Sequence, residues 1–314
     1  MITVIITSIG STGALGVVKA LRDQRQYQVR VVGLDACDNV AGRYLVDEFH
    51  TVPLPDRPEY TERLLAIAAG SNAGLLIPIM EPEMTALARD WPEKAQCRLV
   101  CAPAAALCIC TDKNALTAFL DDNGFQIPAA YDRSSVEYPA ILKPARGTGS
   151  RGVVKLEGPE DLHYHLKKAG PDFLIQQWLD GPEYSVDIFT TFEGRFIGGV
   201  PRLRLETKGG LATKTMTVRE PALLEETARL ARLLDLRGPA NMQAFKHGGQ
   251  FFFTDVNPRF GGACTASIRA GLDGPLFLMN QICGDPIRYA GYRENLVMLR
   301  YWTETYADGN DHIL

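Results

Sequence analysis

The sequence lacks a long apolar segment and lacks an excess of positive charge. No run of apolar residues approaches the roughly 20 needed to cross a bilayer, and Met1 leads directly into the strand-like residues 2–7 instead of a basic region and a cleavage site. The formal net charge of −4 provides no broad basic field for nucleic acid. We therefore expect a cytoplasmic protein without a membrane or nucleic-acid partner, in which any phosphate site is local.

The cysteines lack the pattern of a metal site. There are seven, an odd number, and most lie in apolar stretches. Cys97, Cys101, Cys108 and Cys110 are close in sequence but do not form the two paired CxxC motifs of a zinc site. We expect reduced, buried thiols that contribute to packing, and this interpretation is preferred to a metal site.

The first 110 residues alternate short β-branched segments with helical ones. A chain of 314 residues is longer than one hydrophobic core usually organises, so two or three subdomains are expected. Strand-like segments lie at 2–7, 29–35, 74–80 and 98–102, and helical segments lie at about 15–25 and 59–69. This alternation predicts parallel strands connected by helices in an α/β domain.

The turn after the first strand is rich in glycine, with the sequence GSTGALG from Gly10 to Gly16. Asp35 ends the second strand about 20 residues later, where dinucleotide-binding folds place a ribose-binding acid. A nicotinamide-dependent oxidoreductase is therefore one interpretation. The spacing is GxxGxxG instead of GxGxxG, however, and glycines at such a turn also allow close packing without any ligand. Packing is the preferred interpretation.

Two lysines flank a glycine-rich loop in the next part of the chain. Lys113 begins a helical segment, and Lys143 lies inside the apolar strand-like segment 139–145. A lysine in a strand is unfavourable unless it is paired, and nucleotide phosphates would pair it. The loop 146–152 has backbone N–H groups that can bend around the β- and γ-phosphates. It lacks GK[ST] and connects two strands, so it is not a Walker motif.

Polar side chains gather on a predicted hairpin late in the chain. Two strand-like segments meet at Gly248 and Gly249, and the second segment ends with Asp255 and Asn257. Residues two apart in a strand share a face, so the oxygens of these two side chains point the same way. Grouped oxygen donors suit Mg²⁺, and Arg259 follows where a guanidinium can hold a phosphate. A strand end followed by an Asn-Pro turn is the alternative interpretation.

Taken in order, five motifs resemble the ATP-grasp superfamily: TDK, ILKPARGTGSRGV, IQQWLDGPEYSVDI, NMQAF and TDVNPRFGG. The sequence is most similar to short proteins that resemble the ATP-binding half of the carbamoyl phosphate synthase large chain. The resemblance implies an α/β and α+β fold, with a Rossmann-like N-terminal domain followed by a two-subdomain ATP-grasp fold. The implied divisions are residues 1–110, a small subdomain with the glycine-rich loop at 111–180, and a C-terminal subdomain with the metal site at 181–314.

The resemblance also implies the cofactors, which are ATP and Mg²⁺, with Mn²⁺ as a possible substitute. Lys113 and Lys143 are expected to contact the phosphates, and Lys143 is expected to lie near the adenine as well. The other residues expected at the nucleotide are Gly147, Thr148, Gly149 and Ser150 of the loop, the backbone of Gln176, Gln177, Trp178 and Leu179 at the adenine edge, and Glu183 at the ribose.

Metal binding and phosphoryl transfer are implied for the late hairpin. Gln243, Asp255 and Asn257 are expected to hold Mg²⁺, and Arg259 is expected to stabilise the transferred phosphoryl group together with Lys143. Two departures from the family pattern are present, because Gln177 and Asp255 stand where the family commonly has glutamate. These departures leave open a nucleotide-binding module without turnover.

Three further residues are candidates on the substrate side. Arg202 and Lys214 lie in a cation-rich segment similar to the acceptor side of relatives, and we expect them to meet the substrate carboxylate or the γ-phosphate. A solvated loop is the alternative. Glu81 either binds an amine of a substrate across an interdomain cleft or is an acid that favours the dipole at a helix N-terminus.

The activity that the resemblance implies is that of a ligase. A substrate carboxylate attacks the γ-phosphoryl group of ATP, and an amine, thiol or similar nucleophile captures the acylphosphate. Positioning and charge neutralisation supply most of the catalysis in such a reaction. The expected partners are therefore small-molecule carboxylate and amine substrates, and a homodimer is a possible assembly.

Overall fold

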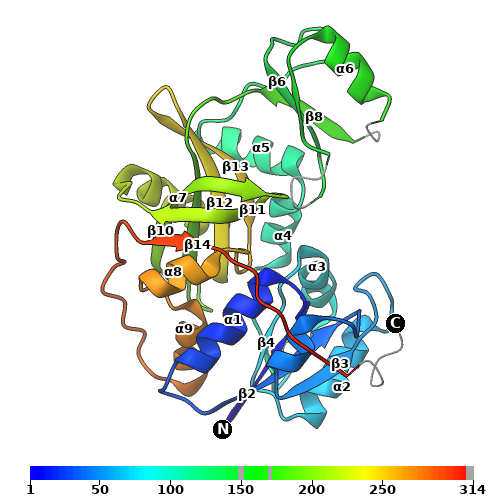
Figure 1. Ribbon diagram of the computed structural model, residues 1–314, viewed down its shortest axis with the longest axis vertical. Coiled ribbons are helices and arrows are strands. Elements are labelled where there is room, and N and C mark those ends of the chain that lie inside the picture. The colour runs from blue at the N-terminus through cyan, green and yellow to red at the C-terminus, as the bar shows by residue number, and fades with distance from the viewer. Residues whose placement is uncertain (148–151, 169–171, 309–314) are drawn as a thin grey trace.

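The computed structural model describes residues 1–147, 152–168 and 172–308, and its described part contains three β-sheets (Figure 1). The five-stranded N-terminal sheet lies at one end of an elongated molecule, and the three-stranded sheet lies at the other end. The six-stranded sheet lies between them. This arrangement confirms the predicted fold class, whereas the exact division at residues 110 and 180 stays a prediction.

The N-terminal sheet has the strand order β3-β2-β1-β4-β5, and each neighbouring pair is parallel. Its strands are β1 (Ile2–Ile6), β2 (Val29–Asp35), β3 (Glu48–Thr51), β4 (Leu75–Ile77) and β5 (Arg98–Leu99). Successive side chains of β1 pack into different cores on the two faces of the sheet. The central strands are continuous apolar runs because both faces are covered, as the β-branched sequence predicts.

Helices connect these strands: α1 (Thr12–Asp23), the 3-10 helix η1 (Ala41–Leu45), α2 (Tyr60–Gly70) and α3 (Glu81–Asp90). Helix α1 begins three residues before the predicted start at residue 15. The hydroxyl of Ser11 accepts a hydrogen bond from the Ala14 N–H at 3.3 Å, which caps the helix at this earlier position. The start of α1 is therefore set by its cap.

The glycines of the first turn lie against neighbouring atoms. A Cβ on Gly16 would stand 3.0 Å from Cys264 Sγ, and a Cβ on Gly13 would stand 3.3 Å from Ile79 Cγ2. The carboxylate of Asp35 accepts the Gly10 N–H at 2.9 Å, so this acid is already bonded to the turn. These contacts support the packing interpretation of the glycines.

The small sheet is antiparallel, with the order β7-β6-β8. It consists of β6 (Ala140–Pro144), β7 (Val154–Leu156) and β8 (Phe173–Gln177), and α6 (Pro159–Leu166) packs on one face. Its hydrophobic core is small, and its buried residues are Ala140, Leu142, Leu156, Leu162 and Ile175. The side chains next to these in β6 and β8 point to the opposite face of the sheet.

The central sheet has the order β13-β12-β9-β10-β11-β14, and its neighbouring strands are antiparallel. Its strands are β9 (Glu183–Thr190), β10 (Phe196–Lys208), β11 (Leu211–Thr217), β12 (Gly238–His247), β13 (Gln250–Asn257) and β14 (Val297–Leu299). Gly248 and Gly249 have φ of 56° and 82° and form the turn between β12 and β13. The predicted late hairpin is therefore confirmed.

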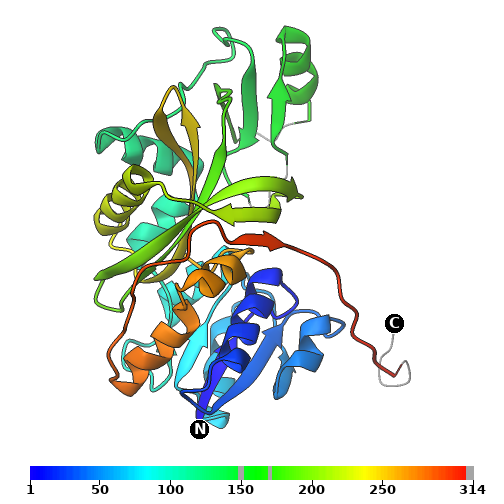
Figure 2. The same ribbon diagram turned by 60° about the vertical axis from the view of Figure 1, so that its left-hand side comes forward.

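The remaining helices connect the parts of the molecule. Helices α4 (Ala104–Cys110), α5 (Lys113–Asp122) and α7 (Pro221–Leu233) pack on the central sheet. Helices α8 (Cys264–Ala270) and α9 (Gly274–Cys283) lie against α1, as both ribbon views show (Figure 2). Val17 of α1 and Leu278 of α9 belong to one buried core. The N-terminal sheet and the central sheet are thus joined by continuous packing.

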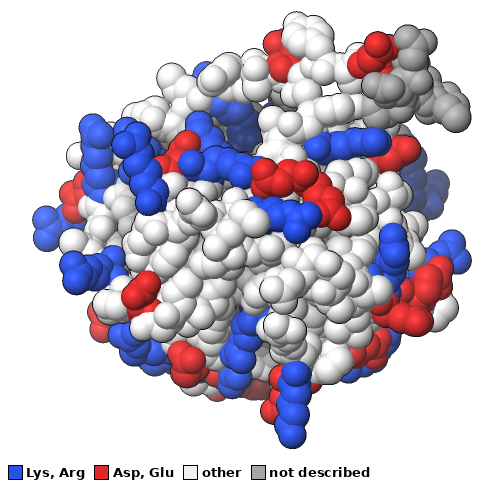
Figure 3. Space-filling view, turned by 90° about the horizontal axis from the view of Figure 1, so that it is seen from below, with Lys and Arg blue, Asp and Glu red and all other residues white. Residues whose placement is uncertain are grey.

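The described chain shows neither a membrane-crossing helix nor a cysteine metal site. None of its helices is long and apolar enough to cross a bilayer, and none of its His, Cys, Asp and Glu residues group in threes around a possible metal position. Cys97, Cys110 and Cys264 are buried, but Cys37, Cys108 and Cys283 are exposed, so the expectation of buried thiols holds only in part. On the face drawn in Figure 3, positive and negative side chains are interspersed.

Candidate functional site

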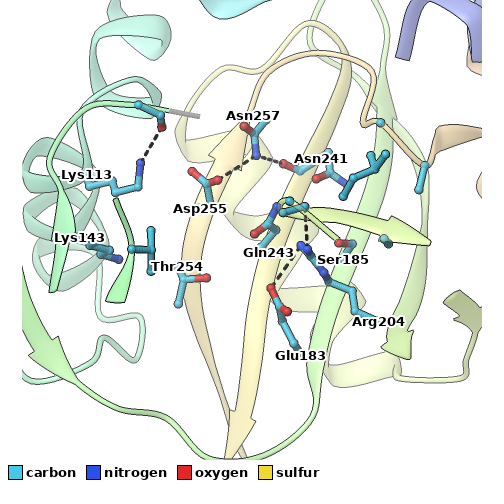
Figure 4. A pocket seen from close by; sticks show the side chains of 18 of the residues that line it. Lys113, Lys143, Glu183, Ser185, Arg204, Asn241, Gln243, Thr254, Asp255 and Asn257 are labelled. Carbon is cyan, nitrogen blue, oxygen red and sulfur yellow. Dashed lines mark hydrogen bonds and ion pairs between the residues drawn. The ribbon is translucent and has the colours of Figure 1, made fainter. Parts of the chain in front are cut away.

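A cavity of about 480 Å³ lies where the three sheets meet. Its walls come from the start of α1, from β6 and β8, and from β9 to β13. Figure 4 labels lining residues of α5, β6, β9, β10, β12 and β13. This volume is in the range that holds a cofactor or a small-molecule substrate. The predicted site residues that line it are Lys113, Lys143, Gly147, Gln176, Gln177, Trp178, Leu179, Glu183, Arg202, Gln243, Asp255, Asn257 and Arg259. Thr148, Gly149 and Ser150 lie outside the described residues.

The charged side chains of the cavity wall are mostly basic. Of the described lining residues, six are basic and two are acidic; the basic ones are Lys113, Lys143, Arg146, Arg202, Arg204 and Arg259, and the acidic ones are Glu183 and Asp255. The whole chain has a formal net charge of −4. The four arginines are each paired with a carboxylate, so the positive charge available to a ligand in this wall is that of the two lysines, which suits an anionic group such as a phosphate.

Lys143 is the more deeply buried of the two lysines in the described cavity wall. Its position in the middle of β6 leaves it only 8% exposed. The pKa of its ammonium is lowered to about 8, chiefly by burial and in addition by the nearby charge of Lys113, while Asp255 partly offsets both effects. In the described part of the chain, no side chain forms an ion pair with it. A buried cation without a partner is the feature that predicted a phosphate contact.

Lys113 and Arg146 hold the base of the glycine-rich loop. The Lys113 ammonium donates to the Gly147 carbonyl at 3.1 Å, and the Lys113 backbone N–H donates to the Ala145 carbonyl at 2.9 Å. Both Nε and one terminal nitrogen of Arg146 donate to Asp112, at 3.0 and 2.9 Å. The same Asp112 caps α5, since it accepts from two backbone N–H groups of the first turn. The start of α5 and the loop are therefore held together.

The late hairpin brings the predicted metal ligands together. Gln243 is opposite Asp255 in the register of β12 and β13, and Asn241 is opposite Asn257. Val256, between the two polar residues, is buried in the core, as the two-residue period predicts. The Asn257 amide Nδ2 donates to Asp255 Oδ2 at 3.3 Å (Figure 4). One carboxylate and two amides with oxygen donors suit Mg²⁺ that shares its remaining positions with phosphates and water.

Arg259 is held from two sides. Its Nε donates to Glu81 Oε1 at 2.8 Å, and one of its terminal nitrogens donates to Asn257 Oδ1 at 3.1 Å. Glu81 is the first residue of α3, as the interpretation as an acid at a helix N-terminus predicts. Its pairing with Arg259 also shows that it faces the C-terminal part of the chain, on the side where an interdomain cleft was predicted. Its carboxylate is bound to Arg259, however, and no substrate amine is needed to explain the pairing.

Glu183 has a protein partner, Arg204, which sequence analysis did not assign to the site. Arg204 lies 3.2 Å from Glu183 and also donates to the Gly210 carbonyl at 2.8 Å. Burial raises the pKa of the Glu183 carboxyl, Arg204 acts in the opposite direction, and the charge of Asp255 raises it further. The alternation of Arg202 and Arg204 in one strand is the signal that places both on one face.

Arg202 is almost fully buried, at 1% exposure, and is bonded to other protein groups. Its guanidinium pairs with Asp187 at 2.8 Å and donates to Ser267 and Thr215. The interpretation as a solvated loop residue is therefore wrong, because β10 carries it into the core. Lys214 does not line the cavity: it is 51% exposed and pairs with Glu206 at 2.6 Å. A substrate contact by Arg202 stays a prediction.

The segment from Gln176 to Leu179 borders the cavity, but several of its groups have protein partners. The Gln177 N–H donates to the Ala129 carbonyl at 2.8 Å, and the Trp178 N–H donates to the Pro139 carbonyl at 3.3 Å. The side chain of Gln176 is 1% exposed, and neither its Oε1 nor its Nε2 has a hydrogen-bond partner among the described residues. Gln176 was expected at the site through its backbone, and its buried side-chain amide was not predicted.

Two family models match separate parts of the chain. Residues 4–99 match the model described as PylC-like, N-terminal domain. Residues 169–305 match the model described as ATP-grasp in the biosynthetic pathway with Ter operon. Fold and site agree with these two matches: residues 169–305 are similar to an ATP-grasp domain, and residues 4–99 are similar to a PylC-like N-terminal domain.

Curated relatives are found among ligases and synthases. D-alanine–D-alanine ligase of Thermotoga petrophila is 28% identical over 171 residues, which are 48% of this chain and 56% of that protein. The carbamoyl phosphate synthase large chain of Clostridium beijerinckii is 26% identical over 138 residues, which are 40% of this chain and 13% of that protein. The matches thus span little more than half of one relative and a small part of the other. The predicted resemblance is confirmed.

A solved structure shows the same fold over nearly the whole chain. The biotin carboxylase domain of the Hydrogenobacter thermophilus 2-oxoglutarate carboxylase aligns with a TM-score of 0.74 and 15% identity. The alignment covers 94% of this chain and 73% of that domain, which is described as a dimer in complex with MgADP, ADP and bicarbonate. At this identity the likeness shows the fold alone.

Proposed function

We propose that the protein is an ATP-dependent ligase, which activates a substrate carboxylate as an acylphosphate and transfers the acyl group to an amine or similar nucleophile. The observation that carries this proposal is Lys143, a buried ammonium without a protein partner, in the same cavity as the oxygen cluster around Asp255. A triphosphate between them would supply the missing counter-charge. The ligase and synthase names of the curated relatives support the proposal.

The phosphates would be held at the lysine side of the cavity. Lys143 points from β6 into the cavity, and Lys113 at the start of α5 lies close enough to influence its pKa. The Lys113 ammonium now donates to Gly147 of the glycine-rich loop, so a phosphate oxygen could replace that carbonyl as its acceptor. The loop backbone would then add N–H donors around the same phosphates. The adenine would lie toward Gln176 and Leu179, and the ribose near Glu183.

Asp255, Gln243 and Asn257 would hold Mg²⁺, which neutralises phosphate charge when it is bound. The residues fit such an ion because their oxygens share one region of the hairpin, and among the described residues the side-chain amide of Gln243 forms no hydrogen bond that would occupy its oxygen. Asn257 Oδ1 already accepts from Arg259. The donor set therefore has a single carboxylate, which suits an ion that arrives with the nucleotide phosphates.

The proposed reaction needs no nucleophilic side chain. An oxygen of the substrate carboxylate attacks the γ-phosphorus, the bond from that phosphorus to the β–γ bridging oxygen breaks, and ADP leaves. The nucleophile then attacks the acyl carbon, the carbon–oxygen bond to the phosphoryl group breaks, phosphate leaves, and the nucleophile loses its proton to solvent. Lys143 and Arg259 would stabilise negative charge on the transferred group, as fixed cations in a cavity do without reorganisation.

A nucleotide-binding module without turnover is the second candidate. The observation that favours it is the single carboxylate of the metal cluster, since Asp255 is its only acidic member among the described lining residues. Release of ADP distinguishes the two candidates. A ligase releases ADP from Mg-ATP only when a suitable carboxylate and nucleophile are present, whereas a binding module is stabilised by ATP and releases none.

The direct test is to follow ADP release with pools of carboxylates and amines, beginning with amino acids. Lys143→Met should abolish substrate-dependent release, and Lys94→Met, at an exposed position, is the matched control. Release that is unchanged in Lys143→Met would contradict the proposal. We also propose a homodimer, which sedimentation of the full chain would show as twice the monomer mass.

A further inference from the structure

The cavity continues beyond the proposed metal cluster, toward the end of β13. In the register of β12 and β13, Gln243 is opposite Asp255, and Asn241, two residues before Gln243, is opposite Asn257. Figure 4 shows Asn241 and Asn257 at one end of the labelled residues and Glu183, the proposed ribose contact, at the other. With the nucleotide between Glu183 and Asp255, the second substrate has to approach the acylphosphate from the Asn241 end.

A buried carboxylate fixes the orientation of the Asn241 amide. The amide Nδ2 donates to Asp187 Oδ1 at 2.6 Å, and Asn241 is only 5% exposed. The other carboxylate oxygen, Asp187 Oδ2, accepts from Arg202 at 2.8 Å and from Ser267 at 2.5 Å. A carboxylate that pairs with a guanidinium accepts hydrogen bonds and donates none. The amide nitrogen must therefore face Asp187, and the amide oxygen cannot take its place.

The oxygen of the same amide is available to a ligand. Asn241 lines the cavity, and none of the residues that the structure describes donates a hydrogen bond to its Oδ1. The backbone closes the nitrogen side, because a Cβ on Gly261 would stand 3.1 Å from Asn241 Nδ2 and 2.9 Å from Asp187 Oδ1. Asn241 thus presents to the cavity a hydrogen-bond acceptor whose position is set by the protein.

The charges at this end suit a neutral ligand that donates a hydrogen bond. Arg202 is joined to Asn241 through Asp187, and Arg259 donates to Asn257, which is opposite Asn241. Both acids of the described cavity wall belong to the ribose and metal parts of the site. An ammonium would meet two guanidinium groups here, whereas a neutral amine, the form that attacks an acyl carbon, offers N–H groups to the amide oxygen. A thiol is only a weak donor.

We propose that the nucleophile is an amine and that Asn241 Oδ1 accepts one of its N–H groups, which directs the nitrogen lone pair at the acyl carbon. The nitrogen forms the new bond to this carbon, the bond from the carbon to the phosphoryl oxygen breaks, phosphate leaves with the electron pair, and a proton passes from the nitrogen to solvent. Asp187 acts through Asn241 and is a positioning residue. The inference rests on the proposed function and narrows its nucleophile to an amine.

The experiment measures the two steps of the reaction separately, on the full chain with Mg²⁺. Acylphosphate formation is followed by positional isotope exchange in ATP labelled at the β–γ bridging oxygen, with a pool of carboxylic acids that have no amino group. Acyl transfer is followed as the ADP release that is added by amino acids or, separately, by mercapto acids with the same carbon skeletons. The variant is Asn241→Ala, and the exposed Asn39→Ala is the matched control.

In the unmodified protein, the amino acids should accelerate ADP release at least about tenfold more than the mercapto acids. Asn241→Ala should lower the amine-dependent rate at least about tenfold, because the nitrogen is no longer oriented. Its isotope exchange should change less than about threefold, since activation of the carboxylate does not use this amide. Asn39→Ala should keep both rates.

The two proposals fail in different ways. If isotope exchange occurs but a folded Asn241→Ala keeps its amine-dependent rate, or loses both rates in parallel, the role of Asn241 is overturned and the ligase proposal stands. If thiols accelerate ADP release in the unmodified protein as much as amines do, the assignment of an amine is overturned, even where the variant does not fold. If the unmodified protein shows neither isotope exchange nor ADP release, the proposed function fails and this inference fails with it.

Discussion

Arg259 and Glu81 form an ion pair that joins the end of β13 to the start of α3, with Nε 2.8 Å from Oε1. Both side chains are largely buried, and Arg259 also donates to Asn257 of the proposed metal cluster. A residue of the N-terminal domain therefore orients the guanidinium that we place at the transferred phosphoryl group. This contact gives the N-terminal domain a role in the geometry of the site.

Glu81→Gln should lower the catalytic rate more than it weakens ATP binding. The amide keeps the shape of the side chain but no longer fixes the guanidinium by charge, so kcat should fall about 10- to 100-fold with the Kd of ATP within about threefold. Steady-state ADP release and calorimetry measure the two quantities. The exposed Glu93→Gln is the matched control. An unchanged kcat would show that the pair is structural only.

Lys143 should make ATP binding depend on pH above neutrality. Its pKa is lowered to about 8 by burial and by Lys113, so the ammonium loses its proton as the pH rises through this value. The affinity for ATP should therefore decrease between pH 7 and pH 9.5, and binding near pH 8 should take up a proton. Calorimetry in buffers of different ionisation enthalpy measures both effects. Lys143→Arg, which stays charged, should lose the pH dependence.

The same group should affect the stability of the ligand-free protein. Because the folded-state pKa is lower than the usual value of about 10.4, the unfolded chain binds more protons than the folded one between these two values. The free energy of unfolding should therefore rise with pH from about 8 to about 10.4 through this lysine. In Lys143→Met this component should be absent. If the free energy of unfolding changed with pH in the same way in both proteins, the assignment to Lys143 would be contradicted.

Asp255→Asn should remove metal-dependent nucleotide binding without unfolding the chain. Asp255 is the only carboxylate of the metal cluster in the described cavity wall, so its loss should reduce substrate-dependent ADP release at least about 100-fold. Mn²⁺ in place of Mg²⁺ allows the metal to be followed by electron paramagnetic resonance in the presence of ATP. The exposed Asp121→Asn is the control. Equal Mn²⁺ binding by both variants would remove Asp255 from the metal site.

Arg202 and Asp187 should be coupled in stability. Both are buried, and removal of one partner leaves an unpaired buried charge, which destabilises by about 3–5 kcal/mol. Asp187→Leu and Arg202→Met should each show such a loss, and the double variant should be more stable than the sum of the two losses predicts. Urea denaturation measures all three. Additive losses would mean that the pair does not act as a unit.

The sequence alone was sufficient to predict features that depend on residues close together in the chain. Continuous apolar segments predicted the parallel sheet, and the alternation from Asp255 to Asn257 predicted their shared face on β13. The turn at Gly248 and Gly249 followed from two residues that adopt positive φ readily. These features are set by neighbours within a few positions, so one sequence is enough to infer them.

Features that depend on distant segments were not predictable. Arg202 looked like a residue of a cationic loop, because its partner Asp187 lies on another strand and the burial of both depends on the sheet. The Glu81–Arg259 pair joins positions far apart in sequence. Gln176 was missed as a side chain because only the finished cavity shows that its amide has no partner. Non-local packing decides each of these cases.

The central claim is that a triphosphate lies between Lys143 and the Asp255 cluster. A crystal structure of the protein with Mg²⁺ and a non-hydrolysable ATP analogue tests it most directly. The account predicts phosphate oxygens within hydrogen-bonding distance of the Lys143 ammonium and a metal ion bound to Asp255. Nucleotide bound instead at the turn from Gly10 to Gly16, with the cavity between the sheets empty, would contradict it.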